Sequence, residues 1–235
     1  MRICVFSDVH GNEESLASAI RVMKSMNPDR FVFLGDLCGY YPRVMECFAQ
    51  LENLTPLLSL RGNHDDYFLK IHGGDESLYA HYKKKYGDTF PHLSSHDNFA
   101  SRLFTWLGSL NSSYHLESEN CFFTHGTINN PLEGRFYPNE NATAIALDRL
   151  PKNVRFVLMG HTHYPVDTTH NGIRFINPGS VGQPRNGCPP SFFFLDTRSS
   201  IGTHVYYSYN RERFRNSIQH VNGLTKYSRE VIWRY

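Results

Sequence analysis

The stretch RICVFSDVHGN, residues 2–12, joins an apolar run to a polar cluster. Residues 2–7 are apolar and rich in types that favour β-structure, so they predict a buried strand. Asp8 and His10 follow directly, where such a strand opens into a loop. Burying a carboxylate or an imidazole there costs free energy unless another group compensates it. The placement therefore indicates a bound group rather than simple packing.

The same arrangement occurs twice more in the first 66 residues. A strand predicted at 30–34 opens into Gly35-Asp36, and one predicted at 57–60 leads into Gly62-Asn63-His64-Asp65. Apolar residues at helical spacing occupy the connections between these strands. This alternation predicts βαβ units, in which the carboxyl ends of the strands share one functional edge of the sheet.

The rest of the chain returns to strands after a break. Residues 67–110 are charged and aromatic, and they predict a helical insertion near the site. The later apolar runs are short and linked by turns, which is typical of antiparallel strands. These patterns predict an α/β fold, a four-layer α-β-β-α sandwich of two mixed β-sheets flanked by helices, in a single domain over 1–235. The later strands are expected at 113–116, 121–124, 154–159, 164–169, 173–176, 191–196 and 203–209, with a helix at 141–149.

Composition narrows the class of protein. Of the 235 residues, 40% are hydrophobic and 20% are charged, and the net charge is +2. This balance is ordinary for a soluble protein and creates no field that would attract nucleic acid. Five cysteines without paired spacing argue against a disulfide framework, and no apolar run has the length of a leader or a membrane span. We therefore expect a soluble cytoplasmic protein without a membrane partner; a homo-oligomer is left open.

Five polar clusters follow apolar, β-like runs in this way. A single such cluster is usually a turn or a helix cap, but five at corresponding strand ends indicate one shared metal site. Nitrogen and oxygen ligands suit Mn, Fe, Zn, Co, Ni or Mg, and the lack of cysteine disfavours a structural zinc site. Seven candidate ligands are too many for one ion and fit two divalent ions if one carboxylate bridges them. The candidates are Asp8, His10, Asp36, Asn63, His125, His161 and His163.

The clusters together resemble the signature of the calcineurin-like metallophosphoesterases. Asn177-Pro178-Gly179-Ser180 and the final strand and helix are similar to the small bacterial and archaeal, phosphodiesterase-like branch of that superfamily. The matching stretches run from residue 8 to residue 188, so the resemblance covers nearly the whole chain. The five clusters are Asp8-x-His10, Gly35-Asp36, Gly62-Asn63-His64-Asp65, His125-Gly126 and Gly160-His161-Thr162-His163.

The resemblance implies a role for each ligand. Asp8, His10 and His163 would hold the first metal ion, and Asn63, His125 and His161 the second. Asp36 would bridge the two ions, which would activate a hydroxide for in-line attack on phosphorus.

His64 would stay off the metals, face the substrate and protonate the leaving group as a general acid. A role in supporting Asn63 is the alternative, and Asp65 is expected to orient His64 by a hydrogen bond. Arg185 is the candidate for binding the phosphate, ahead of Arg61; a solvated loop position is the alternative for Arg185.

One departure from the family pattern narrows the substrate. Protein Ser/Thr phosphatases carry G-D-x-x-D-R-G at the second cluster, whereas this chain reads GDLCGYY over residues 35–41. The second Asp and the Arg are missing, so a protein phosphatase is disfavoured. Tyr40, Tyr41 and the helical insertion are expected to present aromatic surface to a nucleobase or another organic group.

The sequence therefore predicts a metal-dependent hydrolase of a small-molecule phosphomonoester or phosphodiester, with nucleotides among the candidates. The stretch NPGSVGQPR, residues 177–185, is similar to proteins described as dinucleoside polyphosphate hydrolases, which is the alternative activity. A non-catalytic scaffold is disfavoured because all seven ligand positions and His64 are retained.

Overall fold

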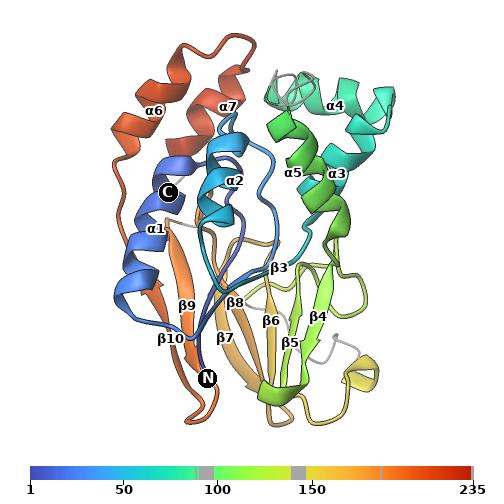
Figure 1. Ribbon diagram of the computed structural model, residues 1–235, viewed down its shortest axis with the longest axis vertical. Coiled ribbons are helices and arrows are strands. Elements are labelled where there is room, and N and C mark those ends of the chain that lie inside the picture. Colours follow the sequence, from blue (N-terminus) through green and yellow to red (C-terminus); the bar gives the residue numbers. More distant parts are fainter. Residues whose placement is uncertain (88, 90–97, 139–146, 186, 234–235) are drawn as a thin grey trace.

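Two five-stranded sheets form the centre of the computed structural model, which describes residues 1–87, 89, 98–138, 147–185 and 187–233 (Figure 1). The first sheet has the order β10 (Ile201–Tyr206), β9 (Ser191–Asp196), β1 (Arg2–Phe6), β2 (Arg30–Phe33) and β3 (Leu57–Ser59). The second has the order β4 (Ser113–Leu116), β5 (Cys121–Thr124), β6 (Phe156–Met159), β8 (Ile173–Pro178) and β7 (Pro165–His170).

Both sheets are mixed, as the sequence predicts. In the first, β1, β2 and β3 are parallel, whereas β9 and β10 pair antiparallel. In the second, β5, β6 and β8 are parallel, and the edge strands β4 and β7 are antiparallel to their neighbours. The antiparallel pairing expected in the second half is therefore present, but it is confined to the edges of that sheet and to the pairs made by β9.

The two sheets face each other across an apolar core. Alternate side chains of β1 point to opposite faces: Ile3 and Val5 contact the second sheet, whereas Cys4 and Phe6 pack against helices. Strand β1 is thus buried on both sides, which explains its continuous apolar run. The inter-sheet core consists of Ile3, Val5, Val32, Leu34, Leu60, Cys121, Phe123, Phe156, Leu158, Ile176, Phe193 and Leu195.

Helices cover the outer face of the first sheet. Helix α1 (Glu13–Ser25) begins at Asn12, whose side-chain oxygen accepts a hydrogen bond from the Ser15 amide at 3.1 Å. Helices α2 (Val44–Glu52), α6 (Arg211–Gln219) and α7 (Lys226–Glu230) complete this layer. The predicted helix at 141–149 lies outside the described residues except for the short 3₁₀ turn Leu147–Arg149, which packs near the outer face of the second sheet.

The predicted insertion consists of helices α3 (Asn63–His72), α4 (Glu76–Tyr86) and α5 (Asn98–Ser109). They gather at the same end of the molecule as α6 and α7 (Figure 1). The helical segment begins at Asn63 rather than at the predicted residue 67, because the Asp65 carboxylate accepts the Gly62 amide at 3.0 Å and starts the helix earlier. Consequently Asn63 and His64 lie in the first turn of α3.

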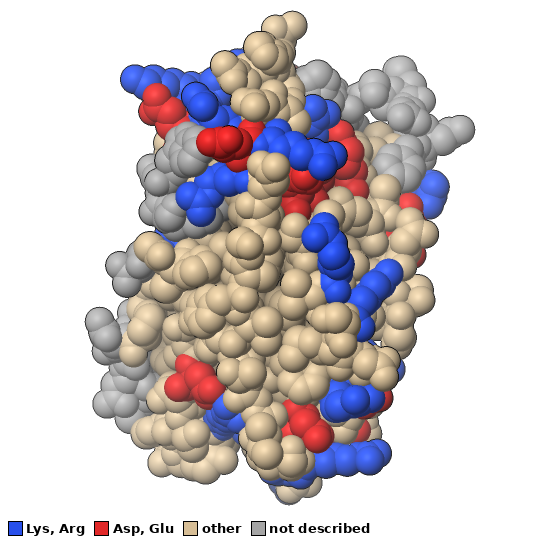
Figure 2. Space-filling model, turned by 90° about the vertical axis from the view of Figure 1, so that its left-hand side faces the viewer, with Lys and Arg blue, Asp and Glu red and all other residues tan. Residues whose placement is uncertain are grey.

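The surface carries both signs of charge. On the face at the left of Figure 1, basic and acidic side chains gather toward the two ends, and the area between them is mostly uncharged apart from basic side chains at the right of the view (Figure 2). No helix of the described part of the chain has the length and apolar character needed to cross a bilayer.

Candidate metal centre

All seven predicted ligands meet at one edge of the two sheets. Each lies just beyond the carboxyl end of β1, β2, β3, β5 or β6, where the parallel strands of each sheet end together. Among the described residues, three groups of acidic and imidazole side chains have ligand atoms within 4.8 Å of one another. These groups are Asp8 with His10 and His163, His10 with Asp36 and His64, and Asp36 with His125 and His161.

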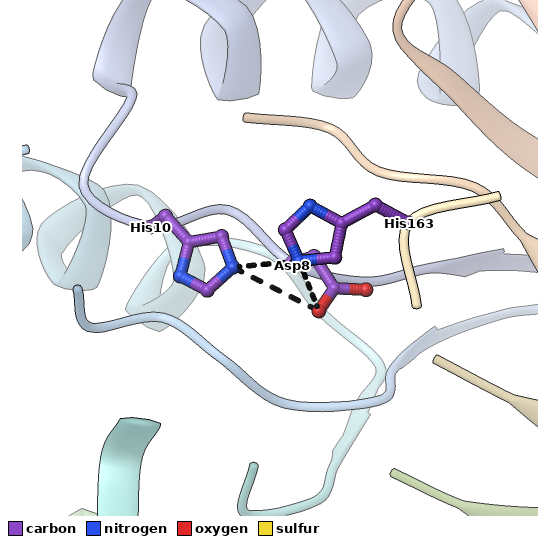
Figure 3. A group of neighbouring side chains, drawn as sticks. All are labelled: Asp8, His10 and His163. Atoms are coloured by element: carbon purple, nitrogen blue, oxygen red, sulfur yellow. Dashed lines mark hydrogen bonds and ion pairs between the residues drawn. The ribbon is translucent and has the colours of Figure 1, made fainter. Parts of the chain in front are cut away.

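The first group combines residues more than 150 positions apart. His10 Nε2 lies 3.8 Å from Asp8 Oδ1 and 3.1 Å from His163 Nε2. His163 Nε2 lies 3.4 Å from the same Asp8 oxygen (Figure 3). Three ligand atoms therefore converge on one point from the loops after β1 and β6.

The ligands predicted for the second ion, Asn63, His125 and His161, form another group, which is built around Asn63. Its side-chain oxygen lies 3.1 Å from His125 Nε2 and 3.0 Å from His161 Nδ1. Asp36 connects the two groups, because its Oδ2 lies 3.5 Å from His125 Nε2 and 3.7 Å from His10 Nε2. The predicted bridging position is thus occupied by a carboxylate that reaches both sides.

Backbone carbonyls orient three of the imidazoles. His10 Nδ1 lies 2.7 Å from the Cys38 carbonyl, His125 Nδ1 lies 2.9 Å from the Leu34 carbonyl, and His163 Nδ1 contacts the Gln183 carbonyl. Because a carbonyl oxygen only accepts, each Nδ1 carries a hydrogen, so in the neutral ring each Nε2 directs its lone pair into the cluster. The lone pairs of His10 and His163 face each other at 3.1 Å, a repulsive arrangement that a cation would relieve.

The Asp8 carboxylate provides a second test of fit. It is fully buried, and neither of its oxygens has a hydrogen-bond partner among the described residues. Burial raises the pKa of Asp8 to about 7, because the charged form lacks solvation. Buried carboxylates without hydrogen bonds are rare unless a metal ion compensates them. The donor set therefore fits divalent cations.

The protonation of the histidines fits the same conclusion. Burial lowers the pKa of His10 to about 3 and that of His161 to about 4, so both rings are neutral and able to act as ligands. Burial disfavours charge on Asp36 and His125 as well, but their mutual attraction prevails. It holds the pKa of Asp36 well below its usual range and raises the pKa of His125 to about 9. A cation bound here would take the place of the proton on His125.

The ligand loops are locally strained. Five of the seven candidates adopt a positive φ, in the left-handed region that non-glycine residues rarely occupy. Such strain persists only where the surrounding structure enforces it, and it clusters at functional sites. The five are Asp8 (58°), His10 (52°), Asp36 (64°), His161 (66°) and His163 (65°).

Tight backbone approach also shapes the site. A Cβ on Gly62 would lie 2.1 Å from Asp36 Oδ1, and one on Gly160 would lie 2.2 Å from Ser7 Oγ. Asn177 donates to the Gly160 carbonyl at 2.7 Å, and Ser180 donates to the Asp8 carbonyl at 2.8 Å. The Asn177–Ser180 stretch thus holds two ligand loops in place, a role that the sequence pattern alone did not reveal.

The prediction that Asp65 orients His64 by a hydrogen bond is wrong. The Asp65 carboxylate instead accepts from the backbone amides of Asp36 (2.8 Å), Cys38 (2.9 Å) and Gly62 (3.0 Å). Its oxygens are occupied in bracing the loop after β2. The partner of His64 Nδ1 is the Tyr82 hydroxyl of α4, which sequence reasoning missed because the contact spans 18 residues without a motif.

A cavity of about 550 Å³ opens above the cluster. Arg185 lines it and donates from Nη2 to the Tyr40 hydroxyl at 2.8 Å, whereas Arg61 lies 3.7 Å from Asp66 and is not among the lining residues. Tyr40 lines the cavity as expected. Tyr41 does not, because it is fully buried against Phe214, and that part of the prediction is wrong.

Comparison with known proteins agrees with this arrangement. Residues 1–200 match the calcineurin-like phosphoesterase superfamily domain. The chain is 28% identical over 203 residues to an uncharacterized protein of Methanocaldococcus jannaschii, covering 79% of this chain and 78% of that protein. It is 26% identical over 206 residues to the phosphodiesterase YfcE of Escherichia coli, covering 83% and 88% of the two chains.

Among solved structures, a metallophosphoesterase from Sphaerobacter thermophilus superposes with a TM-score of 0.81 at 22% identity, covering 100% of this chain and 99% of that one. This likeness confirms the predicted four-layer fold. The match over residues 1–200 assigns the family in addition to the fold. The chain belongs to the calcineurin-like phosphoesterase superfamily and is a metal-dependent phosphoester hydrolase.

Proposed function

We propose that this protein is a dinuclear metal-dependent phosphoesterase that hydrolyses a small-molecule phosphomonoester or phosphodiester. The observation that carries the proposal is the convergence of seven ligand-type side chains, including a buried carboxylate without hydrogen bonds, beneath a cavity lined by His64 and Arg185. In this arrangement Asp8, His10 and His163 would hold one ion, and Asn63, His125 and His161 the other. Asp36 would bridge them.

Each part of the site has a chemical task. Divalent cations, when bound, supply the positive charge that lowers the pKa of a water molecule and attracts phosphate oxygens. Asp36 links the two ligand groups, because its carboxylate lies within 3.7 Å of imidazoles from both. Arg185 provides a further positive group for the phosphate, since its Nη1 is buried without a hydrogen-bond partner among the described residues.

His64 is the proposed general acid. It lies at the start of α3 beside the ligand Asn63, and it lines the same cavity as Arg185. Its ring centroid lies 4.9 Å from that of His10, so a phosphate held at the cluster would place its leaving oxygen within reach of the ring. A proton from His64 would then neutralise the departing alkoxide.

The test is hydrolysis of p-nitrophenyl phosphate and bis-p-nitrophenyl phosphate with Mn²⁺, Co²⁺, Ni²⁺, Zn²⁺ or Mg²⁺ added separately to purified, metal-depleted protein. We expect turnover with at least one metal, and a loss of roughly a hundredfold or more in Asp36→Asn and His64→Ala. Asp167→Asn and His220→Ala, which change surface side chains, are the matched controls and should keep wild-type rates. Absence of turnover with every metal, or full activity in Asp36→Asn, would refute the proposal.

Nucleotides are the proposed substrate class within this function. The cavity is lined by aromatic rings and by the cations Lys85, Arg135 and Arg185, a combination suited to a base linked to phosphate. A panel of nucleoside monophosphates, cyclic nucleotides and dinucleoside polyphosphates, beside simple alkyl esters, tests it. Equal kcat/KM for alkyl esters and nucleotides would contradict this narrower proposal without affecting the hydrolase assignment. The lining tyrosines are Tyr40, Tyr67, Tyr82, Tyr86, Tyr137 and Tyr164.

A further inference from the structure

His64 differs from the carbonyl-bound histidines of the site in the partner of its ring. The Nδ1 atoms of His10, His125 and His163 contact backbone carbonyls, which can only accept a hydrogen bond. His64 Nδ1 instead contacts the Tyr82 hydroxyl, which can donate as well as accept. A carbonyl fixes the ring hydrogen on Nδ1 and leaves Nε2 as a ligand, whereas a donating hydroxyl leaves the hydrogen on Nε2.

Tyr82 is held in one position by its surroundings. It is 3% exposed and lies on α4, packed edge-on against Phe68 at a ring-centroid distance of 5.4 Å and beside Tyr86 at 4.6 Å. Its ring lies nearly perpendicular to that of His64, at 75° and 5.7 Å. Burial raises the pKa of Tyr82 well above its ordinary value, so the hydroxyl keeps its hydrogen.

Gly39 makes room for this contact. A Cβ at residue 39 would lie 2.6 Å from His64 Nδ1, 2.9 Å from His10 Nδ1 and 3.0 Å from the Tyr82 hydroxyl. Its φ of +108° is also one that residues with side chains rarely adopt. A side chain at this position would therefore displace the hydroxyl from His64.

We infer that Tyr82 is the positioning residue for His64: its hydroxyl holds Nδ1, as donor to the neutral ring and as acceptor from the protonated ring, and thereby directs Nε2 toward the leaving group. Among the hydrogen bonds of the described residues, Nδ1 is the only ring atom of His64 in use. When the ring carries both hydrogens, the phenol oxygen accepts from Nδ1 instead. Transfer of the Nε2 proton to the leaving oxygen then gives, transiently, a neutral ring with its hydrogen on Nδ1, and a proton taken up from water at Nε2 restores the acid.

A hydroxyl can thus keep its contact with Nδ1 in both protonation states of the ring, whereas a carbonyl contacts only an Nδ1 that carries a hydrogen. The inference rests on the proposed role of His64 in phosphoester hydrolysis. It adds that the helical insertion, through α4, supplies the group that orients this histidine.

The kinetic test uses Tyr82→Phe, which removes the hydroxyl and keeps the ring. Two esters of the same type are compared, one releasing p-nitrophenolate and one releasing an alkoxide. The alkoxide is the poorer leaving group, so only the cleavage of the alkyl ester depends strongly on protonation by a general acid. We expect kcat to fall by about tenfold or more for the alkyl ester and by less than about threefold for the nitrophenyl ester, with KM unchanged. His64→Ala should show the same selectivity, and the double variant should be no slower than His64→Ala alone.

Tyr207→Phe is the matched control. Tyr207 is also a buried tyrosine whose hydroxyl is hydrogen-bonded, to Ser15 at 3.0 Å, but it does not line the cavity. The Tyr207→Phe variant should lose about as much stability as Tyr82→Phe, but the ratio of its kcat values for the two esters should equal that of the wild-type protein. Equal losses for both esters in Tyr82→Phe, or losses that multiply with those of His64→Ala, would overturn the inference.

A spectroscopic test does not depend on turnover. In protein labelled with ¹⁵N in histidine and loaded with diamagnetic Zn²⁺, at a pH where the ring is neutral, His64 should show Nδ1 as the acceptor and Nε2 as the protonated nitrogen. Tyr82→Phe should abolish this preference, and Tyr207→Phe should keep it. If the neutral His64 ring of the wild-type protein carries its hydrogen on Nδ1, the inference about Tyr82 is refuted. Because this result does not depend on ester cleavage, it can be told apart from a failure of the proposed hydrolase function.

Discussion

The strand-end loops and the helical insertion contribute to the same cavity by different means. In the loops, backbone carbonyls, glycines and left-handed residues position the ligands, and the sequence shows this directly because Gly, Asp and His recur after each strand. In the insertion, side chains of α3 and α4 position His64 and line the cavity, without a recurring pattern. Under the proposed function, the loops would hold the metal ions, and the insertion would orient His64 and contact the substrate.

The largest expected effect comes from disturbing a loop backbone. Gly62→Ala would place a methyl group 2.1 Å from Asp36 Oδ1, so the Asp36 carboxylate must move. We expect activity to fall by roughly a hundredfold or more, because misplaced catalytic groups are severely penalised. Metal content by elemental analysis and kcat are the measurements.

Gly108→Ala is the control for that substitution. Gly108 lies within α5, and a Cβ there meets nothing within 4 Å. Alanine should stabilise this helix by up to about 1 kcal/mol and leave activity unchanged. Wild-type metal content and activity in Gly62→Ala would contradict this prediction, because the loop would then accommodate a methyl group beside Asp36 without moving the carboxylate.

Asp8→Asn should produce opposite effects with and without metal. Asparagine tolerates the positive φ at this position, and it removes a buried charge that lacks a hydrogen bond. Metal-depleted Asp8→Asn should therefore unfold at a higher temperature than metal-depleted wild type at pH 8, but gain less from added metal. Thermal unfolding of both proteins, measured with and without added metal, tests the higher unfolding temperature of the metal-depleted variant and its smaller gain from metal.

The pH dependence of that difference has a definite sign. Burial raises the folded-state pKa of Asp8 to about 7 from an unfolded value of 3.8, so the folded protein binds the additional proton between these values. Metal-depleted wild type should thus lose a few kcal/mol of unfolding free energy from this group as the pH rises from 4 to 7, and Asp8→Asn should not. A parallel pH dependence in the two proteins would contradict the assignment.

A smaller effect is expected from the cavity rim. Arg185→Ala removes a cation that lines the cavity and should raise KM by about tenfold, with a smaller change in kcat. Arg61→Ala is the matched control, because Arg61 lies beside Asp66 and is not among the lining residues. Similar KM values for the two variants would assign the phosphate contact to another group.

Local pattern was sufficient to predict the strands and the polar clusters that follow them. The apolar run before Asp8 and the glycines beside Asp36 and Asn63 reflect constraints that act within a few residues, so they are visible in the sequence. The start of α3 was misplaced because Asp65 acts as a cap through backbone amides rather than as a partner of His64. Tyr41 was misjudged because its neighbour in space, Phe214, lies far away in the chain.

The sequence by itself determined the order of the strands, the identity of the metal-type side chains and the position of each at a strand end. It also showed that the aspartate of the protein phosphatase pattern is missing at residue 39. Only the tertiary structure placed the Tyr82 hydroxyl against His64, left the Asp8 oxygens without partners and brought Arg185 to the cavity. The physical reason is that hydrophobic periodicity and turn chemistry are local, whereas side-chain hydrogen bonds and burial depend on which distant segments the packed sheets bring together.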